Sequence, residues 1–341
     1  MDITHQAKRY RIKSPDNTKK GAQAYEATLR RRLAEGKSIE GTEARNRREQ
    51  TFKAFAEFWY KTHVVVHNKP STISKAKSVL AKKLVPFFGS RPIEAITTLD
   101  IERYKAQQAN RGLANKTINN ELSILGKCLR DAKKWHSLTA IPEITPLKVP
   151  PTNYLFLEEE EAARLLQHVH GIAYEIVYVA LKTGLRRGEL QGLYWSDINL
   201  TNRTLIVRHN WCSVTQALLS PKGNRTRTIP LSNGVCDLLR RRHASDGFVF
   251  AEGKTVFDAH NIGAQLASAS AEAGLPKVTL HVLRHTFASQ LAMKGVSVAV
   301  IQKLLGHTDI KTTMRYAHLS QNSLIEAVRK LESNNLSRSA A

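Results

Sequence analysis

Four short motifs in the second half of the chain carry side chains suited to phosphate chemistry. Arg186 lies in TGLRRGEL, where a glycine turns the chain before a new helix, and its guanidinium has donors for two phosphate oxygens. His281 and Arg284 lie three residues apart in HVLRHTFAS and share one helical face, so both could reach one phosphate. LLGH ends at His307, and TTMRYAH contains Tyr316. These residue types favour a phosphate-containing ligand.

Each motif alone also has a purely structural interpretation. Arg186 could simply pair with Glu189, three residues further along the new helix. A lone histidine is usually structural, and a lone tyrosine is usually half-buried with its hydroxyl satisfied. The order and separation of the four motifs therefore carry the functional argument, and no single motif does.

The order of an arginine, His-x-x-Arg, Gly-His and tyrosine resembles the signature of the tyrosine recombinases, also called phage-integrase-like site-specific recombinases. The resemblance covers about residues 51–331. It implies that Tyr316 is the nucleophile, that Arg186 and Arg284 form a phosphate clamp, and that His281 and His307 handle protons and hydrogen bonds. It also implies cleavage and rejoining of DNA through a 3′-phosphotyrosyl intermediate and a Holliday junction, with no metal or nucleotide cofactor.

The sixth catalytic position in this family is a lysine on a β-hairpin between the first arginine and the His-x-x-Arg. Lys222, in the turn SPKGNR, fits this position best, because the turn leaves its side chain at a hairpin tip. Arg225 and Arg227 are the neighbouring competitors, and we expect both to contact backbone phosphates instead.

The resemblance further implies a homotetramer on two double-stranded DNA sites, with a DNA-bending accessory protein as another candidate partner. About 50 residues precede the first expected domain, which favours an integrase of a phage or other mobile element over a Xer-like enzyme that resolves chromosome or plasmid dimers. A type IB topoisomerase-like enzyme and a catalytically silent DNA-binding regulator are the remaining alternatives.

Composition agrees with a nucleic-acid partner. The chain has 341 residues, with 52 lysines and arginines against 29 acidic residues, a formal net charge of +23. The excess is largest in residues 51–150, which favours a polyanion over a membrane surface. No apolar run is long enough to span a bilayer, and three scattered cysteines make no disulfide framework or zinc site, so we expect a cytoplasmic, nucleoid-associated protein.

Hydrophobic periodicity predicts a mainly α fold that positions these residues. Helices are expected at 23–35, from 51, at 72–88, from 97 to about 110, and at 116–135, with a short strand at 9–13. Phe52, Phe55, Phe58 and Trp59 are expected on one core-facing side, and Thr97 with Asp100 predicts a capping box. We therefore expect a small helical domain here, and the resemblance implies that residues 51–140 are the core-binding domain, of the SAM-like type.

Prolines at 142, 146, 150 and 151 predict an extended linker at 141–151. Residues 152–331 are expected to be a mostly α catalytic domain with a small antiparallel sheet, including strands at 204–209 and 227–231 and helices from 258 onward. Glu158 to Glu161 are expected to cap a helix. Residues 322–335 predict an amphipathic helix that packs in cis or in trans, followed by a tail at 332–341. Residues 1–50 form a basic extension, either a truncated arm-type DNA-binding module or a disordered segment.

Overall fold

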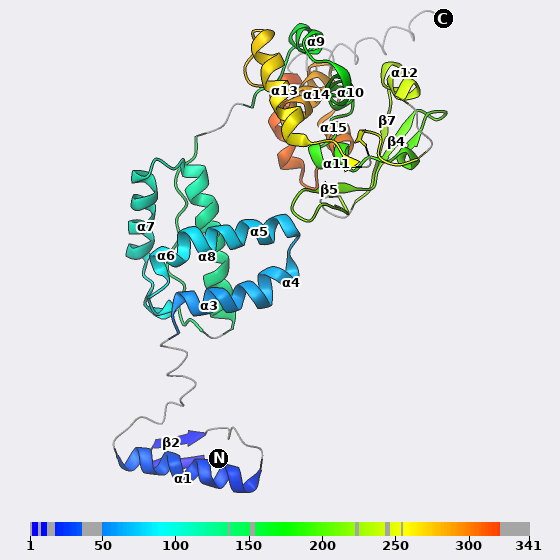
Figure 1. Ribbon diagram of the computed structural model, residues 1–341. Coiled ribbons are helices and arrows are strands. Elements are labelled where there is room, and N and C mark those ends of the chain that lie inside the picture. Colours follow the sequence, from blue (N-terminus) through cyan, green and yellow to red (C-terminus); the bar gives the residue numbers. More distant parts are fainter. Residues whose placement is uncertain are drawn as a thin grey trace, which may run out of the picture. The chain divides into compact units, whose positions relative to one another are not determined.

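The computed structural model describes most of the chain and divides it into two compact units, Met1–Pro150 and Pro151–Ala341 (Figure 1). The described residues are 2–5, 8–11, 18–35, 50–135, 137–150, 154–221, 225–242, 246–253 and 255–320. Lys222, the charged segment 36–49 and the predicted C-terminal helix 322–335 lie outside them. The predicted fold class, helical with small antiparallel sheets, is confirmed.

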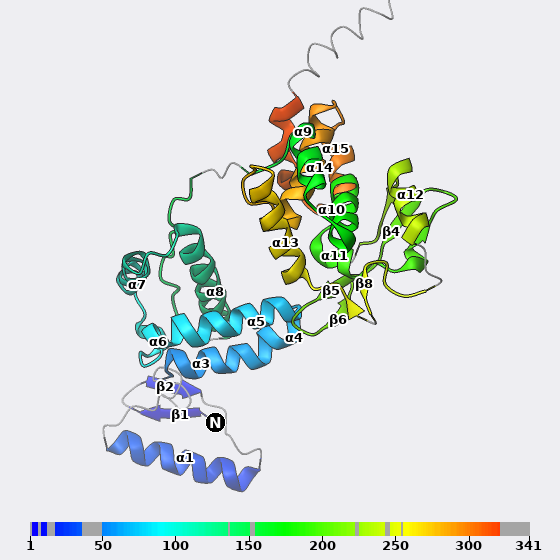
Figure 2. The same cartoon turned by 45° about the horizontal axis from the view of Figure 1, so that its top comes forward.

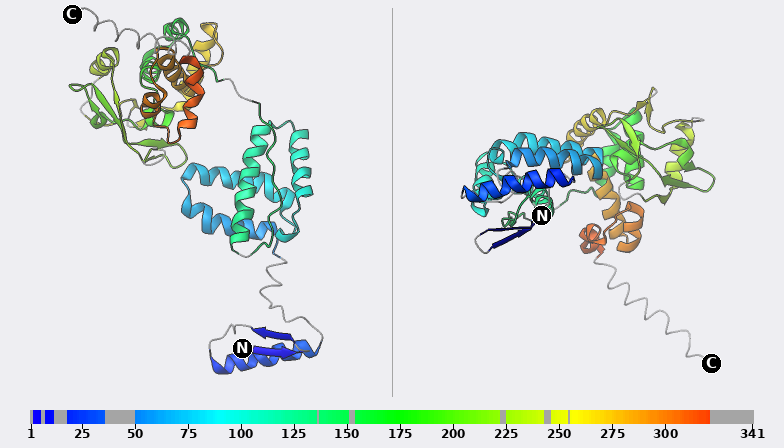
Figure 3. Two further views of the ribbon diagram at one scale, coloured as in Figure 1. Left: turned by 180° about the vertical axis from the view of Figure 1, so that it is seen from behind. Right: turned by 90° about the horizontal axis from the view of Figure 1, so that it is seen from below.

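The first residues form a small folded element. Strands β1 (Asp2–His5) and β2 (Lys8–Arg11) pair antiparallel, and α1 (Lys19–Ala34) lies against them, with Ile3 and Leu29 buried between (Figure 3). The sequence analysis missed β1 and began the helix four residues late, because the Thr18 side chain caps it by accepting from the Gly21 N–H. The role of residues 1–50 stays a prediction.

The helical part of the first unit has a core rich in aromatic side chains, with Trp59, Phe88 and Tyr104 among them. The Thr97–Asp100 capping box at the start of α7 is confirmed. The α-helices are α3 (Phe52–Trp59), α4 (Val65–His67), α5 (Pro70–Val79), α6 (Val85–Phe88), α7 (Thr98–Asn110) and α8 (Asn115–Lys134).

Two expectations for this region were wrong in detail. Phe58 does not share the buried face of Phe52 and Phe55; its side chain is 51% exposed and packs edge-on against Trp135. The helix expected at 72–88 is interrupted by a π-helical turn, Leu80–Leu84, just before Pro86. Proline has no N–H for the carbonyl four residues earlier, so a regular α-helix cannot continue there.

The segment predicted as an extended linker docks on α8. Asn119 exchanges hydrogen bonds with the backbone of Leu147, donating to its carbonyl and accepting from its N–H, each at 2.8 Å. Asn115 donates to the Lys148 carbonyl at 2.8 Å. Residues 141–150 therefore belong to the first unit up to its end at Pro150.

The second unit is built on two central helices, α10 (Gly171–Thr183) and α14 (Leu280–Met293), which pack side by side (Figure 2). Glu158 and Glu161 form a capping box at α9, as expected. The other α-helices are α9 (Glu159–Gln167), α11 (Arg187–Gln191), α12 (Asn233–Arg242), α13 (Ala259–Glu272) and α15 (Val298–Leu305). Short 3-10 segments follow α15 at Ile310–Thr312 and Met314–Ser320.

All strand pairs of the second unit are antiparallel among the described residues. A three-stranded sheet has the order β3-β4-β7, with Leu205 of β4 opposite both Ile198 and Ile229. Two further pairs are β5 with β6 and β8 with β9. The strands are β3 (Ile198–Asn199), β4 (Thr204–Val207), β5 (Asn210–Cys212), β6 (Ala217–Leu219), β7 (Arg227–Pro230), β8 (Ala251–Glu252) and β9 (Thr255–Val256).

Candidate active site

The four motifs meet at the end of α10, the start of α11, α14 and the segment after α15. Gly184 ends α10 in the left-handed region, with φ of +64°, and a Cβ there would lie 2.4 Å from the Phe287 ring. Only glycine fits this turn. It brings Arg186, the N-cap residue of α11, toward α14 and the end of α15.

Arg186 pairs with Glu189, as its purely structural interpretation predicted. Its Nη1 donates to Glu189 Oε1 at 2.7 Å, and its backbone N–H donates to Oε2 at 2.8 Å. Glu189 therefore satisfies both the backbone N–H of Arg186 and one of its guanidinium nitrogens. The Arg186 side chain nevertheless stays 25% exposed, with Nη2 donating to the Gly306 carbonyl at 3.0 Å.

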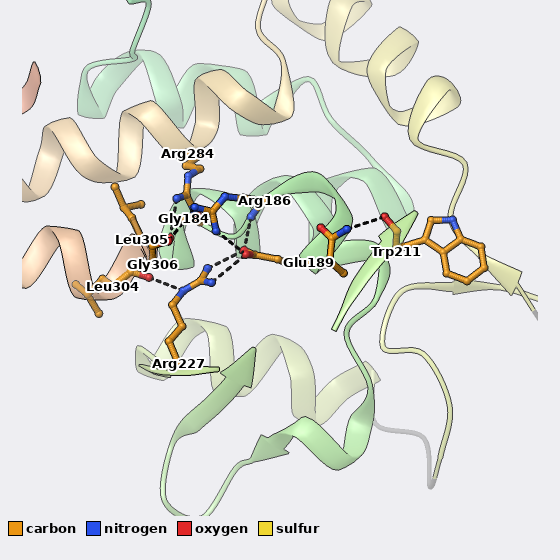
Figure 4. A network of polar contacts seen from close by, with 10 residues as sticks. Gly184, Arg186, Glu189, Trp211, Arg227, Arg284, Leu304, Leu305 and Gly306 are labelled. Atoms are coloured by element: carbon orange, nitrogen blue, oxygen red, sulfur yellow. Dashed lines mark hydrogen bonds and ion pairs between the residues drawn. The ribbon is translucent and has the colours of Figure 1, made fainter. Parts of the chain in front are cut away.

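Arg284 is buried beside it on α14. It donates from Nη1 to the Gly184 carbonyl at 2.5 Å and from Nη2 to the Leu305 carbonyl at 2.6 Å (Figure 4). Burial, together with the nearby charge of Arg186, lowers the pKa of Arg284 to about 9, which leaves it a cation at pH 7. A guanidinium has five N–H donors, so each arginine keeps donors for a phosphate.

Two predicted histidines lie around these arginines. His307 follows the left-handed Gly306, and its Nδ1 is 2.8 Å from the Thr313 hydroxyl. Burial and Arg284 lower the pKa of His307 to about 3. His281, in the first turn of α14, has its pKa lowered by desolvation and by Arg284. Both imidazoles are therefore neutral at pH 7.

Tyr316 is 1% exposed and lies in the 3-10 segment after α15. Its hydroxyl is 2.6 Å from Nδ1 of His285, a residue in the HVLRHTFAS motif to which the sequence analysis gave no role. Burial raises the pKa of Tyr316 to about 12 and lowers that of His285 to about 4. Both groups are therefore neutral at pH 7 and share one hydrogen bond, whose donor is set by the tautomer of His285.

Tyr154 completes the packing around Tyr316. Its ring meets Tyr316 edge-on at 5.1 Å, and its hydroxyl donates to the Arg315 carbonyl at 2.8 Å. With Tyr316 enclosed in this way, a phosphodiester can reach its hydroxyl only after the side chain leaves this position. The side-chain pattern around Tyr154 gave no signal for this contact, which joins residues 161 positions apart in sequence.

Arg227 departs from the expectation that it contacts DNA phosphates. It begins β7 on the same face as buried Ile229, and its side chain is 9% exposed. Nη1 and Nη2 donate to the two oxygens of Glu189 at 2.9 and 2.7 Å, and Nε donates to the Leu304 carbonyl at 2.8 Å. Arg225, two residues earlier, is exposed.

Two neutral histidines, the buried His285 and the half-buried His307, predict a pH-dependent stability. An unfolded chain takes up protons on His285 and His307 near pH 6.5, whereas the folded chain does so only near pH 4 and 3. The free energy of unfolding should therefore fall as the pH drops from 7 to 5, by up to about 1.4 kcal/mol per pH unit for each histidine. Urea unfolding at several pH values measures this slope, and His307→Asn should reduce it; an unchanged slope would contradict the assigned burial.

Two family models match this chain, one in each unit. Residues 155–323 match the Phage integrase family, and residues 51–106 match the Phage integrase N-terminal SAM-like domain, together more than half of the chain. The ICEBs1 integrase of Bacillus subtilis is 26% identical over 95% of this chain and 92% of its own length.

Solved structures share the fold at lower identity. The Tn1549 transposon integrase, in complex with transposon right end DNA, has a TM-score of 0.71 and 22% identity over 83% of this chain and all of its own. A lambda integrase tetramer bound to a Holliday junction has a TM-score of 0.65 and 18% identity over 94% of this chain and 93% of its own. Among the residues that the structure describes, no helix is both long and apolar enough to cross a membrane.

Proposed function

Because the chain belongs to the phage integrase family of tyrosine recombinases, we propose that it is a site-specific DNA strand-transferase of a phage or other mobile element. The observation that carries the proposal is the meeting of Arg186 and Arg284 at the end of α15, from which the chain leads through His307 to Tyr316. The match to the ICEBs1 integrase extends into the first 50 residues and supports the integrase role over dimer resolution.

The two arginines supply charge stabilisation. Attack on a phosphodiester places extra negative charge on the non-bridging oxygens, and fixed guanidinium donors stabilise that charge more than they stabilise the ground state. Backbone carbonyls and Glu189 already hold Arg186 and Arg284 in place, so little reorganisation is needed when DNA binds. His281 and His307 add neutral hydrogen-bonding groups around the same phosphate.

The covalent step uses Tyr316. The Tyr316 hydroxyl gives its proton to a neutral histidine of the site, and its oxygen attacks phosphorus. The bond from phosphorus to the 5′ oxygen breaks, and the Lys222 ammonium donates a proton to that leaving oxygen. The 5′ hydroxyl of a partner strand then gives its proton to the now neutral Lys222 and attacks the phosphotyrosyl phosphorus. The bond to the Tyr316 oxygen breaks, and this oxygen takes its proton back from the histidine. Each step exchanges one phosphodiester for another, so the proposal requires no nucleotide as an energy source, and the two arginines supply the charge stabilisation.

The domains and partners follow from this role. We assign residues 51–140 as the core-binding domain, 141–151 as the linker, which docks on α8 up to Pro150, 152–331 as the catalytic domain, 332–341 as the tail and 1–50 as an arm-type DNA-binding region. Ser71, Thr72, Lys75, Asn120 and Ser123 line a hollow on α5 and α8 and offer hydrogen bonds to a duplex. The active assembly is a homotetramer on two DNA sites, as the solved lambda integrase tetramer on a Holliday junction supports, with a DNA-bending protein as accessory. It acts in the cytoplasm, on the nucleoid.

A nicked suicide substrate tests the proposal. Cleavage near the nick releases a short strand that cannot rejoin, so a covalent protein–DNA adduct accumulates and is visible on a denaturing gel. A DNA-binding regulator with a silent active site would bind the same duplex without forming the adduct. A topoisomerase-like enzyme would form the adduct and relax supercoils without exchanging strands between two sites.

Lys222→Ala should slow cleavage of ordinary DNA, because the 5′ oxygen then leaves without a proton donor. A substrate with sulfur in place of that oxygen should restore most of the rate, since a thiolate leaves without protonation. Arg225→Ala is the matched control, because it removes a cation from the same turn. The sulfur substrate should not rescue any defect of this variant. Equal defects on both substrates for Lys222→Ala would move the general acid to another residue.

A further inference from the structure

Three consecutive carbonyls at the end of α15 each accept a hydrogen bond from a different arginine (Figure 4). Arg227 donates to Leu304, Arg284 to Leu305 and Arg186 to Gly306, at 2.8, 2.6 and 3.0 Å. Carbonyls in the last turn of a helix lack partners within it and carry the negative end of its dipole. The end of α15 is therefore a shared anchor for three guanidinium groups, two of which form the proposed phosphate clamp.

We infer that Arg227 is a positioning residue of this clamp, acting through Glu189 and the end of α15 rather than through DNA. The inference rests on the proposed function, because it assigns Arg227 a task in the cleavage step.

Glu189 connects Arg227 to Arg186. Oε1 accepts from Nη1 of both arginines, while Oε2 accepts from Nη2 of Arg227 and from the backbone N–H of Arg186. The Glu189 side chain is 1% exposed, and the hydrogen bonds and charges of Arg227 and Arg186 outweigh burial and lower its pKa to about 2. The carboxylate is therefore ionised and shared between two cations at neutral pH.

Sharing the carboxylate keeps Arg186 available. Without Arg227, Arg186 would be the remaining guanidinium that pairs with Glu189 among the described residues. This ion pair would compete directly with binding of a phosphate by Arg186. With Arg227 present, the three groups together keep a net positive charge. Arg227 thus neutralises Glu189 so that Arg186 can serve the phosphate.

Arg227 also supports the turn that leads to His307. Gly306 has φ of +64°, and a Cβ at this position would lie 2.9 Å from Cδ and 3.0 Å from Nη1 of Arg227. The backbone of the turn therefore packs directly on the Arg227 side chain. Loss of Arg227 would loosen Gly306 and, with it, the positions of His307 and of the carbonyls that hold Arg186 and Arg284.

The test separates positioning from DNA contact by measuring binding and cleavage independently. Half-site affinity is measured at several salt concentrations, and single-turnover cleavage of the nicked substrate is measured at saturating DNA. For Arg227→Ala, we expect affinity within about threefold of wild type, an unchanged salt slope, and cleavage slower by about 100-fold. Arg240→Ala, which removes an exposed arginine of the same charge on α12, should change neither.

A conservative variant covers the case in which Arg227→Ala fails to fold. Arg227→Lys keeps a cation beside Glu189, but one ammonium cannot hold both carboxylate oxygens and the Leu304 carbonyl in the same geometry. We expect it to melt near the wild-type temperature and to cleave about tenfold more slowly. Full cleavage by Arg227→Lys would overturn the inference, because charge alone would then suffice.

Direct contact with DNA predicts the opposite pattern. Arg227→Ala would then reduce the magnitude of the salt slope by about 0.9 and weaken binding, while cleavage at saturation stayed normal. That result would also overturn the inference, and it would leave the proposed function intact. Absence of any adduct from the wild-type protein would instead overturn the proposed function, and this role of Arg227 with it.

A double-mutant cycle identifies the route of the effect. If Arg227 acts through Glu189, the Arg227→Ala and Glu189→Gln changes should be strongly non-additive, with the double variant no slower than the worse single variant. Multiplying defects would show that Arg227 acts independently of Glu189 and would contradict the route proposed here.

Discussion

Replacing Tyr316 with phenylalanine is expected to abolish the covalent adduct while leaving DNA binding unchanged. The substitution removes one oxygen, and with it the proposed nucleophile. The phenyl ring can keep its edge-on contact with Tyr154, so the core around it should stay packed. His285 loses its hydrogen-bond partner, which should lower the free energy of unfolding by about 1 kcal/mol. The nicked suicide substrate and a half-site binding assay measure the two properties separately.

Tyr194→Phe serves as the matched control, because it removes a phenol elsewhere in the same unit and should still form the adduct. Tyr178 and Tyr194 are not expected to replace Tyr316. An adduct from the Tyr316→Phe variant would assign the nucleophile to a different residue. Loss of both binding and adduct would indicate that Tyr316 is needed for the fold of the segment, and not for the chemistry alone.

The parts of the site that follow local rules could be predicted from the sequence. Gly184 and Gly306 are glycines because both positions adopt positive φ. Gly306 directly precedes His307, and Gly184 lies two residues before Arg186. The capping boxes at α7 and α9 depend on residues three apart, so their sequence spacing is sufficient. Helical spacing also placed His281 and Arg284 together on α14.

The parts that depend on contacts between distant segments could not be predicted in this way. Nothing in the sequence indicates that His285 meets a tyrosine 31 residues away, because that contact depends on how the segment after α15 packs on α14. Arg227 is an intermediate case. Strand alternation places Arg227 on the same face as Ile229, so its inward direction could be predicted from the sequence. Its contact with Glu189 could not, because Glu189 lies on another element.

Because Arg227 points inward, a positive charge near the site does not by itself indicate a contact with DNA. Three arginines and one carboxylate are buried or partly buried together, and one of these arginines, Arg227, binds Glu189 rather than DNA. Exposed cations such as Arg225 are better candidates for contacts to backbone phosphates. A net charge of +23 therefore overstates the number of groups that meet DNA directly.

Arg284→Ala should produce the second-largest effect and should differ from Arg186→Ala in a specific way. Both variants lose donors to the transition state, so each should cleave about 100 to 1000-fold more slowly at saturating DNA. Arg284 is also the donor to two buried carbonyls, Gly184 and Leu305, and removing it leaves both without that bond. An unsatisfied buried polar group costs about 1 to 3 kcal/mol, so Arg284→Ala should also lower the free energy of unfolding.

Arg186→Ala should affect stability less, because Glu189 keeps both hydrogen bonds from Arg227 and the Gly306 carbonyl lies in a partly exposed turn. Urea unfolding and single-turnover cleavage, measured on the same two variants, distinguish the roles. If Arg284→Ala unfolds like wild type, the carbonyl contacts contribute little, and Arg284 serves DNA alone. If it cleaves like wild type, Arg284 is not part of the clamp, and the end of α15 anchors an arginine whose task is structural.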